Sequence, residues 1–356
     1  MLISFGEFLN EGGNVKIGDV EATRINLKEV DRKDIVRMLE RSLAVINAHY
    51  KRFSGEPLWV KELFKSKKFL SGSSLHFFDR KIPDKVFVEK KPTVGDIDTQ
   101  INKSMAEQVK KWLDSLHGTK LGYLTFVGYK SSAGQYITLW TIDKYNLNIQ
   151  IDLELVDYEN NMPTAWSSFS HSSSWADIQA SIKGVFHKYI LRALTSKNMR
   201  EITLLKGKKE TPTKIMTGEH SFSVALGLRR KLQQTETPGV YREIATKDSK
   251  YITDLQEIFK TLFGHLPNAS ELEQFESYVG VLKLIKKYFT PSEIDNVILG
   301  FSLLLWGQGA QGLVRGNPEE DFETKKVAYD MMLKELGRKQ PKEVDAMIDS
   351  YYKAYK

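Results

Sequence analysis

The N-terminal part of the chain has a helical pattern of apolar residues. Ile35, Leu39, Leu43 and Ile46 recur at spacings of four and three residues, which places them on one face of an amphipathic helix. A second, shorter helix is expected over residues 59–65. These segments predict that helices precede the first long strand.

Residues 147–156 alternate strictly between apolar and polar side chains, which is typical of a strand. One side carries Leu147, Ile149, Ile151, Leu153 and Leu155, and the other carries Asn148, Gln150, Asp152 and Glu154. Shorter strands are expected at 94–101, 122–129 and 136–142, and a helix at 104–116. These patterns predict a mixed sheet with helices beside it.

The later part of the chain is mainly helical in pattern. A helix is expected from residue 175 to about residue 194, and further helices from about residue 248 to the end. Two capping boxes, Asn268 with Glu271 and Thr290 with Glu293, mark helix starts. We therefore predict an α+β protein.

Two regions are expected along this chain. Residues 12–245 form the mixed region, with a core at about 60–160 and a helical extension at 166–215. Residues 246–356 form an all-helical domain. A length of 356 residues is consistent with more than one domain.

The composition limits the kinds of functional site that the chain can form. The chain has no cysteine, which excludes disulfides, thiolate metal sites and cysteine nucleophiles and is consistent with the cytoplasm. Lys and Arg exceed Asp and Glu by seven, an excess that suits nucleic acid or phosphorylated substrates and equally suits solubility. We expect no membrane segment, because no apolar run approaches the roughly 18 residues that spanning requires.

Three aspartates form a candidate metal site. Asp96 and Asp98 lie two residues apart on an expected strand, so both side chains lie on one face. Asp152 lies on the polar side of another strand. Carboxylates are the ligands that Mg²⁺ or Mn²⁺ prefer, and three of them suit two-metal phosphoryl transfer. Gly72-Ser73, at a turn before a helix, are candidates for binding a triphosphate.

Together these residues resemble the signature of the DNA polymerase β nucleotidyltransferase superfamily. That signature is a Gly-Ser turn opening a helix, a D-h-D strand and a third acidic residue on a nearby strand, matched here by Gly72-Ser73, Asp96-Ile97-Asp98 and Asp152. The resemblance covers roughly residues 12–195 and implies a mixed sheet flanked by helices. Gly12-Gly13-Asn14 is similar to the same region of phage-encoded members.

The resemblance also implies roles for individual residues. Asp96 and Asp98 would bind both metal ions, and Asp152 would bind the catalytic ion and help to activate the acceptor hydroxyl. The residues expected to bind the nucleoside triphosphate are Gly72, Ser73, Ser74, Lys183 and Lys188. The two lysines, on the expected 175–194 helix, are equally well explained as solvated helix residues. One departure is that 22 residues separate Ser73 from Asp96, more than is usual in this superfamily.

The function expected from these residues is transfer of a nucleoside monophosphate from an NTP to a hydroxyl. The basic stretch 183–214 favours RNA as the acceptor, for instance a tRNA end, with a protein hydroxyl as the main competitor. A glycosyltransferase with a D-x-D/Mn²⁺ site would explain Asp96 and Asp98 but leaves Gly72-Ser73 and Asp152 without roles. A non-catalytic nucleic-acid-binding protein does not require three acids.

The first eleven residues form a short amphipathic segment that resembles the leaders of internal head proteins of large tailed bacteriophages. Such leaders are cut after a Leu/Ile-x-Glu, which here is Leu9-Asn10-Glu11. The resemblance implies packaging in a virion head and action in the host cytoplasm. An ordinary N-terminal helix explains the same pattern.

Overall fold

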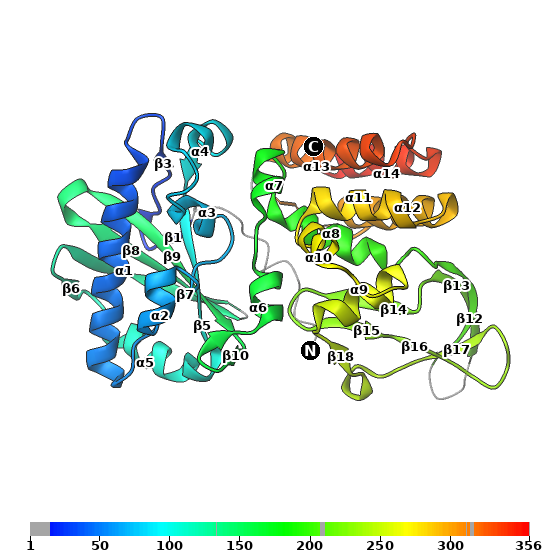
Figure 1. The fold of residues 1–356 in the computed structure, drawn as a ribbon, viewed down its shortest axis with the longest axis horizontal. Coiled ribbons are helices and arrows are strands. Elements are labelled where there is room, and N and C mark those ends of the chain that lie inside the picture. Colours follow the sequence, from blue (N-terminus) through cyan, green and yellow to red (C-terminus); the bar gives the residue numbers. More distant parts are fainter. Residues whose placement is uncertain (1–14, 133, 207–210, 311, 314–316, 356) are drawn as a thin grey trace. The chain divides into compact units, whose positions relative to one another are not determined.

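The computed structural model describes residues 15–132, 134–206, 211–310, 312–313 and 317–355. The candidate leader at 1–11 therefore lies outside the described residues. Helices and strands both occur in each half of the chain, and the predicted α+β class is confirmed (Figure 1). The chain divides into two compact units, Met1–Gln179 and Ala180–Lys356.

A five-stranded sheet forms the centre of the first unit. Its order is β5 (Asp96–Asn102), β9 (Leu147–Val156), β8 (Gln135–Ile142), β7 (Leu124–Ser132) and β6 (Lys120–Leu121). β5 pairs with β9 in parallel, and the other neighbours are antiparallel. The predicted strand at 147–156 is confirmed to the residue.

The apolar face of this sheet packs on two helices, α1 (Arg32–Ser54) and α5 (Ala106–Ser115). α1 carries the apolar face that the sequence predicts, and both helices share one core with strand residues such as Ile97 and Ile151. Trp112 of α5 and Trp140 of β8 are fully buried there. Complete burial of a large apolar side chain stabilises the fold by roughly 2–3 kcal/mol, so this layer holds β5 and β9 firmly.

Short elements surround the sheet of the first unit. The helices are α2 (Lys61–Ser66), α3 (Ser74–Phe78), α4 (Asp84–Lys90), η2 (Lys103–Met105), η3 (Asp143–Tyr145), α6 (Ala165–Ser170) and α7 (Trp175–Gln179). The strand pairs are β1 (Lys16–Ile17) with β2 (Val20–Glu21), β3 (Ile25–Asn26) with β4 (Thr93–Val94), and β10 (Tyr158–Glu159) with β11 (Met162–Pro163).

One prediction is wrong in this region. Residues 81–91 are rich in charge and contain Pro83, a composition that predicts a loop. Seven of them instead form α4, which begins directly after Pro83 and is held by one fully buried side chain, Phe87. A single apolar anchor leaves no periodic pattern, so the helix depends on tertiary packing rather than on amphipathicity.

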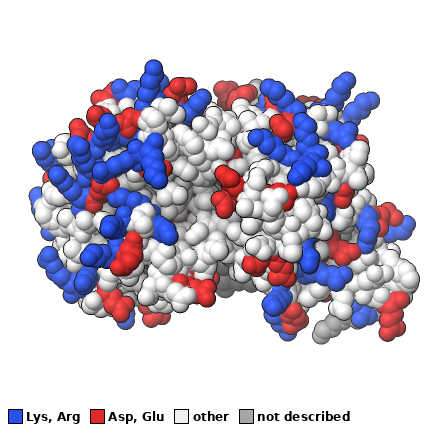
Figure 2. Space-filling view, in the orientation of Figure 1, with Lys and Arg blue, Asp and Glu red and all other residues white. Residues whose placement is uncertain are grey.

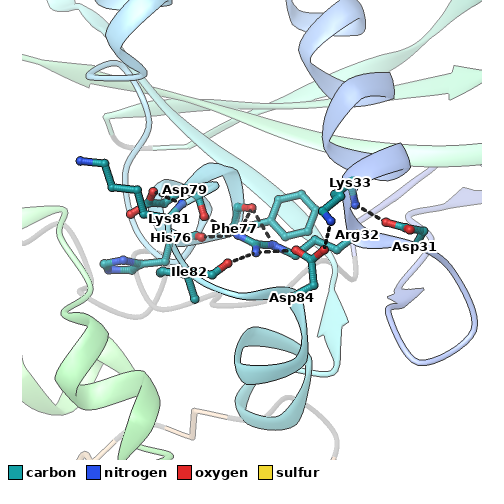
Figure 3. A network of polar contacts seen from close by, with 9 residues as sticks. All are labelled: Asp31, Arg32, Lys33, His76, Phe77, Asp79, Lys81, Ile82 and Asp84. Atoms are coloured by element: carbon teal, nitrogen blue, oxygen red, sulfur yellow. Dashed lines mark hydrogen bonds and ion pairs between the residues drawn. The ribbon is translucent and has the colours of Figure 1, made fainter.

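Arg32, at the start of α1, holds α3 and α4 together (Figure 3). Its buried guanidinium donates hydrogen bonds to the backbone carbonyls of His76, Phe77, Asp79 and Ile82 and to the carboxylate of Asp84. It also lies over the ring of Phe87, 4.5 Å from the centroid. The group therefore satisfies the carbonyl end of α3 and neutralises an acidic residue at the start of α4.

The second unit begins with α8 (Gly184–Leu194) and continues with two small sheets. One sheet has the order β13 (Thr211–Thr217), β12 (Arg200–Lys206), β17 (Val240–Glu243), β16 (Leu232–Gln234), and the other has the order β14 (His220–Ser223), β15 (Gly227–Arg230), β18 (Tyr251–Ile252). After η4 (Thr246–Asp248), the helices are α9 (Leu255–Phe263), α10 (Ala269–Phe275), α11 (Tyr278–Tyr288), α12 (Pro291–Trp306), α13 (Pro318–Leu336) and α14 (Lys342–Tyr355). Both predicted capping boxes are present.

The second unit contains a fully buried ion pair. Lys325 lies 3.2 Å from Asp321 one turn away on α13, and both side chains are inaccessible to solvent. The hydroxyl of Tyr351 on α14 completes the group, donating to Asp321 over 2.7 Å. Burial lowers the pKa of Lys325 to about 8.

A further expectation differs from the structure. The helix expected from 175 to about 194 is interrupted, because Ser181 has a left-handed backbone (φ +59°) and Lys183 is extended. The C-terminal run of helices begins at α9, and the expected domain boundary near residue 245 stays a prediction. No helix among the described residues is both long and apolar enough to cross a bilayer.

Candidate metal centre

The register of two parallel strands brings the three aspartates together. Asp98 on β5 is paired directly with Asp152 on β9, and Asp96 lies two residues earlier on the same face as Asp98. One oxygen from each carboxylate lies within 4.8 Å of the other two. The geometry therefore places all three predicted ligands at one point of the sheet.

The turn at Gly72 lies directly against this cluster. Gly72 has a left-handed backbone (φ +54°), and a Cβ there would overlap the Oδ2 atom of Asp98. Both properties require glycine at this position. The long separation between Ser73 and Asp96 in the sequence thus does not separate the turn from the carboxylates in space.

Hydrogen bonds hold the segment before α3 along β5. Ser71 N–H donates to the Asp98 carbonyl over 3.1 Å, and Asp98 N–H donates to the Ser74 hydroxyl over 2.9 Å. Gly72 N–H donates to the carbonyl of His171, at 2.8 Å. Ser74 is therefore a structural partner of Asp98 in this arrangement, and the Gly72 N–H bonds within the protein.

The electrostatics of the cluster favour a bound cation. Burial raises the pKa of Asp98 well above its ordinary value, and the charges of Asp96, Glu154 and Asp152 raise it further. The ammonium of Lys91 opposes these effects. Burial, and then the charge of Asp96, likewise raise the pKa of Asp152. Because divalent cations remove this repulsion, the donor set fits Mg²⁺ or Mn²⁺, which prefer carboxylate oxygens.

Two polar neighbours of Asp152 on β9 also make contacts at this site. The Gln150 amide donates to the Oδ1 atom of Asp152 over 3.0 Å. Glu154, one step further along the same face, accepts a hydrogen bond from the Ser71 hydroxyl over 2.6 Å. The alternation of β9 places Gln150, Asp152 and Glu154 on one face, and this was the available signal for both residues.

Lys91 is a further basic group at this site, and its sequence position does not indicate a role. Its ammonium donates to the Ser73 hydroxyl. It is close enough to Asp98 and to His76 to lower the pKa of each. Position alone in the sequence did not indicate this contact, because Lys91 follows Lys90 in a charged segment and its contact with Ser73 spans 18 residues.

The two lysines predicted to bind phosphate lie in the second unit. Lys183 is the residue before α8, and Lys188 lies on α8 itself. Their contact with a nucleotide stays a prediction.

Comparisons with protein-family models, with curated protein sequences and with solved structures each found no match. What can be said of function therefore rests on the residues of this chain and on their geometry.

Proposed function

We propose that this protein is a metal-dependent nucleotidyltransferase that moves a nucleoside monophosphate from an NTP to a hydroxyl acceptor. The observation that carries the proposal is the convergence of Asp96, Asp98 and Asp152 with Gly72 packed against Asp98. A D-x-D/Mn²⁺ glycosyltransferase would need the first two residues only. A role for all four residues is what the nucleotidyltransferase signature predicts.

The chain supplies ligands and orientation for the reaction. The acceptor oxygen forms a bond to the α-phosphorus, the bond from that phosphorus to the bridging oxygen of the β-phosphate breaks, and pyrophosphate and a proton are released. Two divalent cations, when bound, would stabilise the attacking and leaving oxygens. Asp96 and Asp98 would hold both, and Asp152, oriented by Gln150, would act beside the acceptor hydroxyl.

RNA is the acceptor that we favour. The chain has a net charge of +7, and Figure 2 shows that each unit carries positive side chains interspersed with acidic ones. Such a surface suits a polyanion held by many weak phosphate contacts rather than by one deep basic patch. Binding of this kind weakens steeply as salt is raised.

The test is incubation of the purified protein with each α-labelled NTP, Mg²⁺ and total RNA. Label in RNA supports the proposal, and label in protein would move the acceptor to a protein hydroxyl. The Asp96→Asn/Asp98→Asn double variant should lose transfer, whereas Asp34→Asn, an exposed carboxylate on α1, should keep it. The proposal would be refuted if the protein transferred the sugar of a UDP-sugar and transferred no nucleotide from any NTP.

A further inference from the structure

Lys91 is held beside the candidate metal centre by features on both sides of it in the sequence. Its N–H caps α4 by donating to the Phe87 carbonyl over 2.7 Å. Pro92 follows and ends the helix, because proline has no N–H and restricts the residue before it. The next residues form β4, which pairs with β3, and Asp96 begins β5 directly afterwards.

The anchor of α4 further limits where Lys91 can lie. Phe87 is fully buried, and its ring contacts both the guanidinium of Arg32 and the ring of Trp175, which stacks on it with centroids 5.9 Å apart. Arg32 also binds the end of α3, the helix that begins directly after Ser73. The buried side chain of Arg32 thus fixes two short helices: α3, which begins after Ser73, and α4, which ends before Lys91.

The charge balance of the site calls for a cation at this place. Three carboxylates, two divalent cations and a nucleoside triphosphate together remain negative, and the leaving pyrophosphate gathers negative charge as its bond breaks. Burial lowers the pKa of the neighbouring His76, so its imidazole is neutral at pH 7. Lys91 brings a positive charge that is half-buried and close enough to Asp98 to lower its pKa.

We propose that Lys91, held beside the hydroxyl of Ser73, binds the phosphate groups of the nucleotide beyond the α-phosphate. This inference rests on the proposed function and names a residue that holds the leaving group. The hydrogen bond from Lys91 to Ser73 places two donors next to each other, at the edge of the carboxylate cluster. An ammonium and a hydroxyl in this arrangement suit the oxygens of a polyphosphate.

The experiment compares Lys91→Met with Lys90→Met, which makes the same charge change one residue away. Lys90 is exposed and pairs with Glu89, so it serves as the matched control. Calorimetry measures binding of tripolyphosphate in the presence of Mg²⁺, and electron paramagnetic resonance measures binding of Mn²⁺ alone. Loss of a charge-assisted hydrogen bond predicts roughly 10- to 100-fold weaker tripolyphosphate binding in Lys91→Met.

Binding of Mn²⁺ alone should not weaken in Lys91→Met, because the variant removes a positive charge that opposes the cation. Lys91→Arg should keep most of the tripolyphosphate affinity, since it keeps the charge. If wild type binds both probes and Lys91→Met matches Lys90→Met, the role of Lys91 is refuted while the metal centre stands. If wild type binds neither probe, the proposed function and this inference fall together.

Discussion

Replacing Gly72 with alanine should disrupt the candidate metal centre through a single added methyl group. The backbone at Gly72 is left-handed (φ +54°), a conformation that costs an alanine about 1–2 kcal/mol. The new Cβ would also overlap the Oδ2 atom of Asp98. Restoring an ordinary van der Waals separation of about 3.5 Å requires a movement on the order of 1 Å.

That movement is large on the scale of metal coordination. Metal–ligand distances tolerate deviations of about 0.2 Å, and a misplacement of about 1 Å at an active site costs on the order of 100-fold. We therefore expect Gly72→Ala to weaken Mn²⁺ binding by roughly 10- to 100-fold and to reduce transfer at least as much. The measurement is Mn²⁺ titration followed by electron paramagnetic resonance, with unfolding by urea to record stability.

Gly18→Ala separates backbone strain from the contact with Asp98. Gly18 has nearly the same backbone angle (φ +58°), lies in the exposed turn between β1 and β2, and has nothing within 4 Å of its Cβ position. It should lose about 1–2 kcal/mol of stability and keep the Mn²⁺ affinity of wild type. Equal affinities in the two variants would show that Asp98 does not depend on the turn and would refute the reasoning.

Three further predictions test the charged groups. Asp98→Asn should raise the metal-free stability by on the order of 1 kcal/mol at pH 7, because burial and like charges raise the pKa of Asp98, and should abolish the stabilisation by Mg²⁺ seen in urea unfolding. Arg32→Met should destabilise the protein by roughly 3–5 kcal/mol in the same assay, because it leaves several backbone carbonyls, among them the buried one of Phe77, without their donor. Burial lowers the pKa of Lys325 from 10.5 to about 8, so between these pH values the unfolded chain binds more protons than the folded one, and stability should rise with pH. Lys325→Met should not show this rise. A flat stability profile of the wild type over this range would contradict the prediction.

How well each element could be predicted depends on how local its determinants are. β9 follows from alternation, because one face packs on the helices and the other carries polar groups. The pattern did not reveal that the polar face is covered as well: Gln150 and Asp152 are 4% and 5% exposed. Alternation reports the chemistry of a face, whereas its burial depends on segments that are distant in sequence, such as the Ser71–Glu154 contact.

The three carboxylates could be predicted for a similar reason. Two of them lie two residues apart on one strand, and the third lies on the polar face of a clearly patterned strand. The direct pairing of Asp98 with Asp152 was not available from the sequence, because register is set by the packing of the whole sheet. The same limit applies to Lys91, whose contact with Ser73 depends on how α4 folds back.

The 22 residues between Ser73 and Asp96 are more than the superfamily that this chain resembles usually has there, and the structure gives them a physical role. They form α3 and α4, two helices too short to be stable alone, and Arg32 holds both through bonds to their ends. The folded insertion returns Lys91 to Ser73 and leads into β5. A longer connection would ordinarily hold the turn less firmly beside the carboxylates. Here the added residues place the ammonium of Lys91 next to Ser73 in that turn. Shortening the insertion should therefore remove phosphate affinity before it removes metal affinity, since Asp96, Asp98 and Asp152 are held by the sheet.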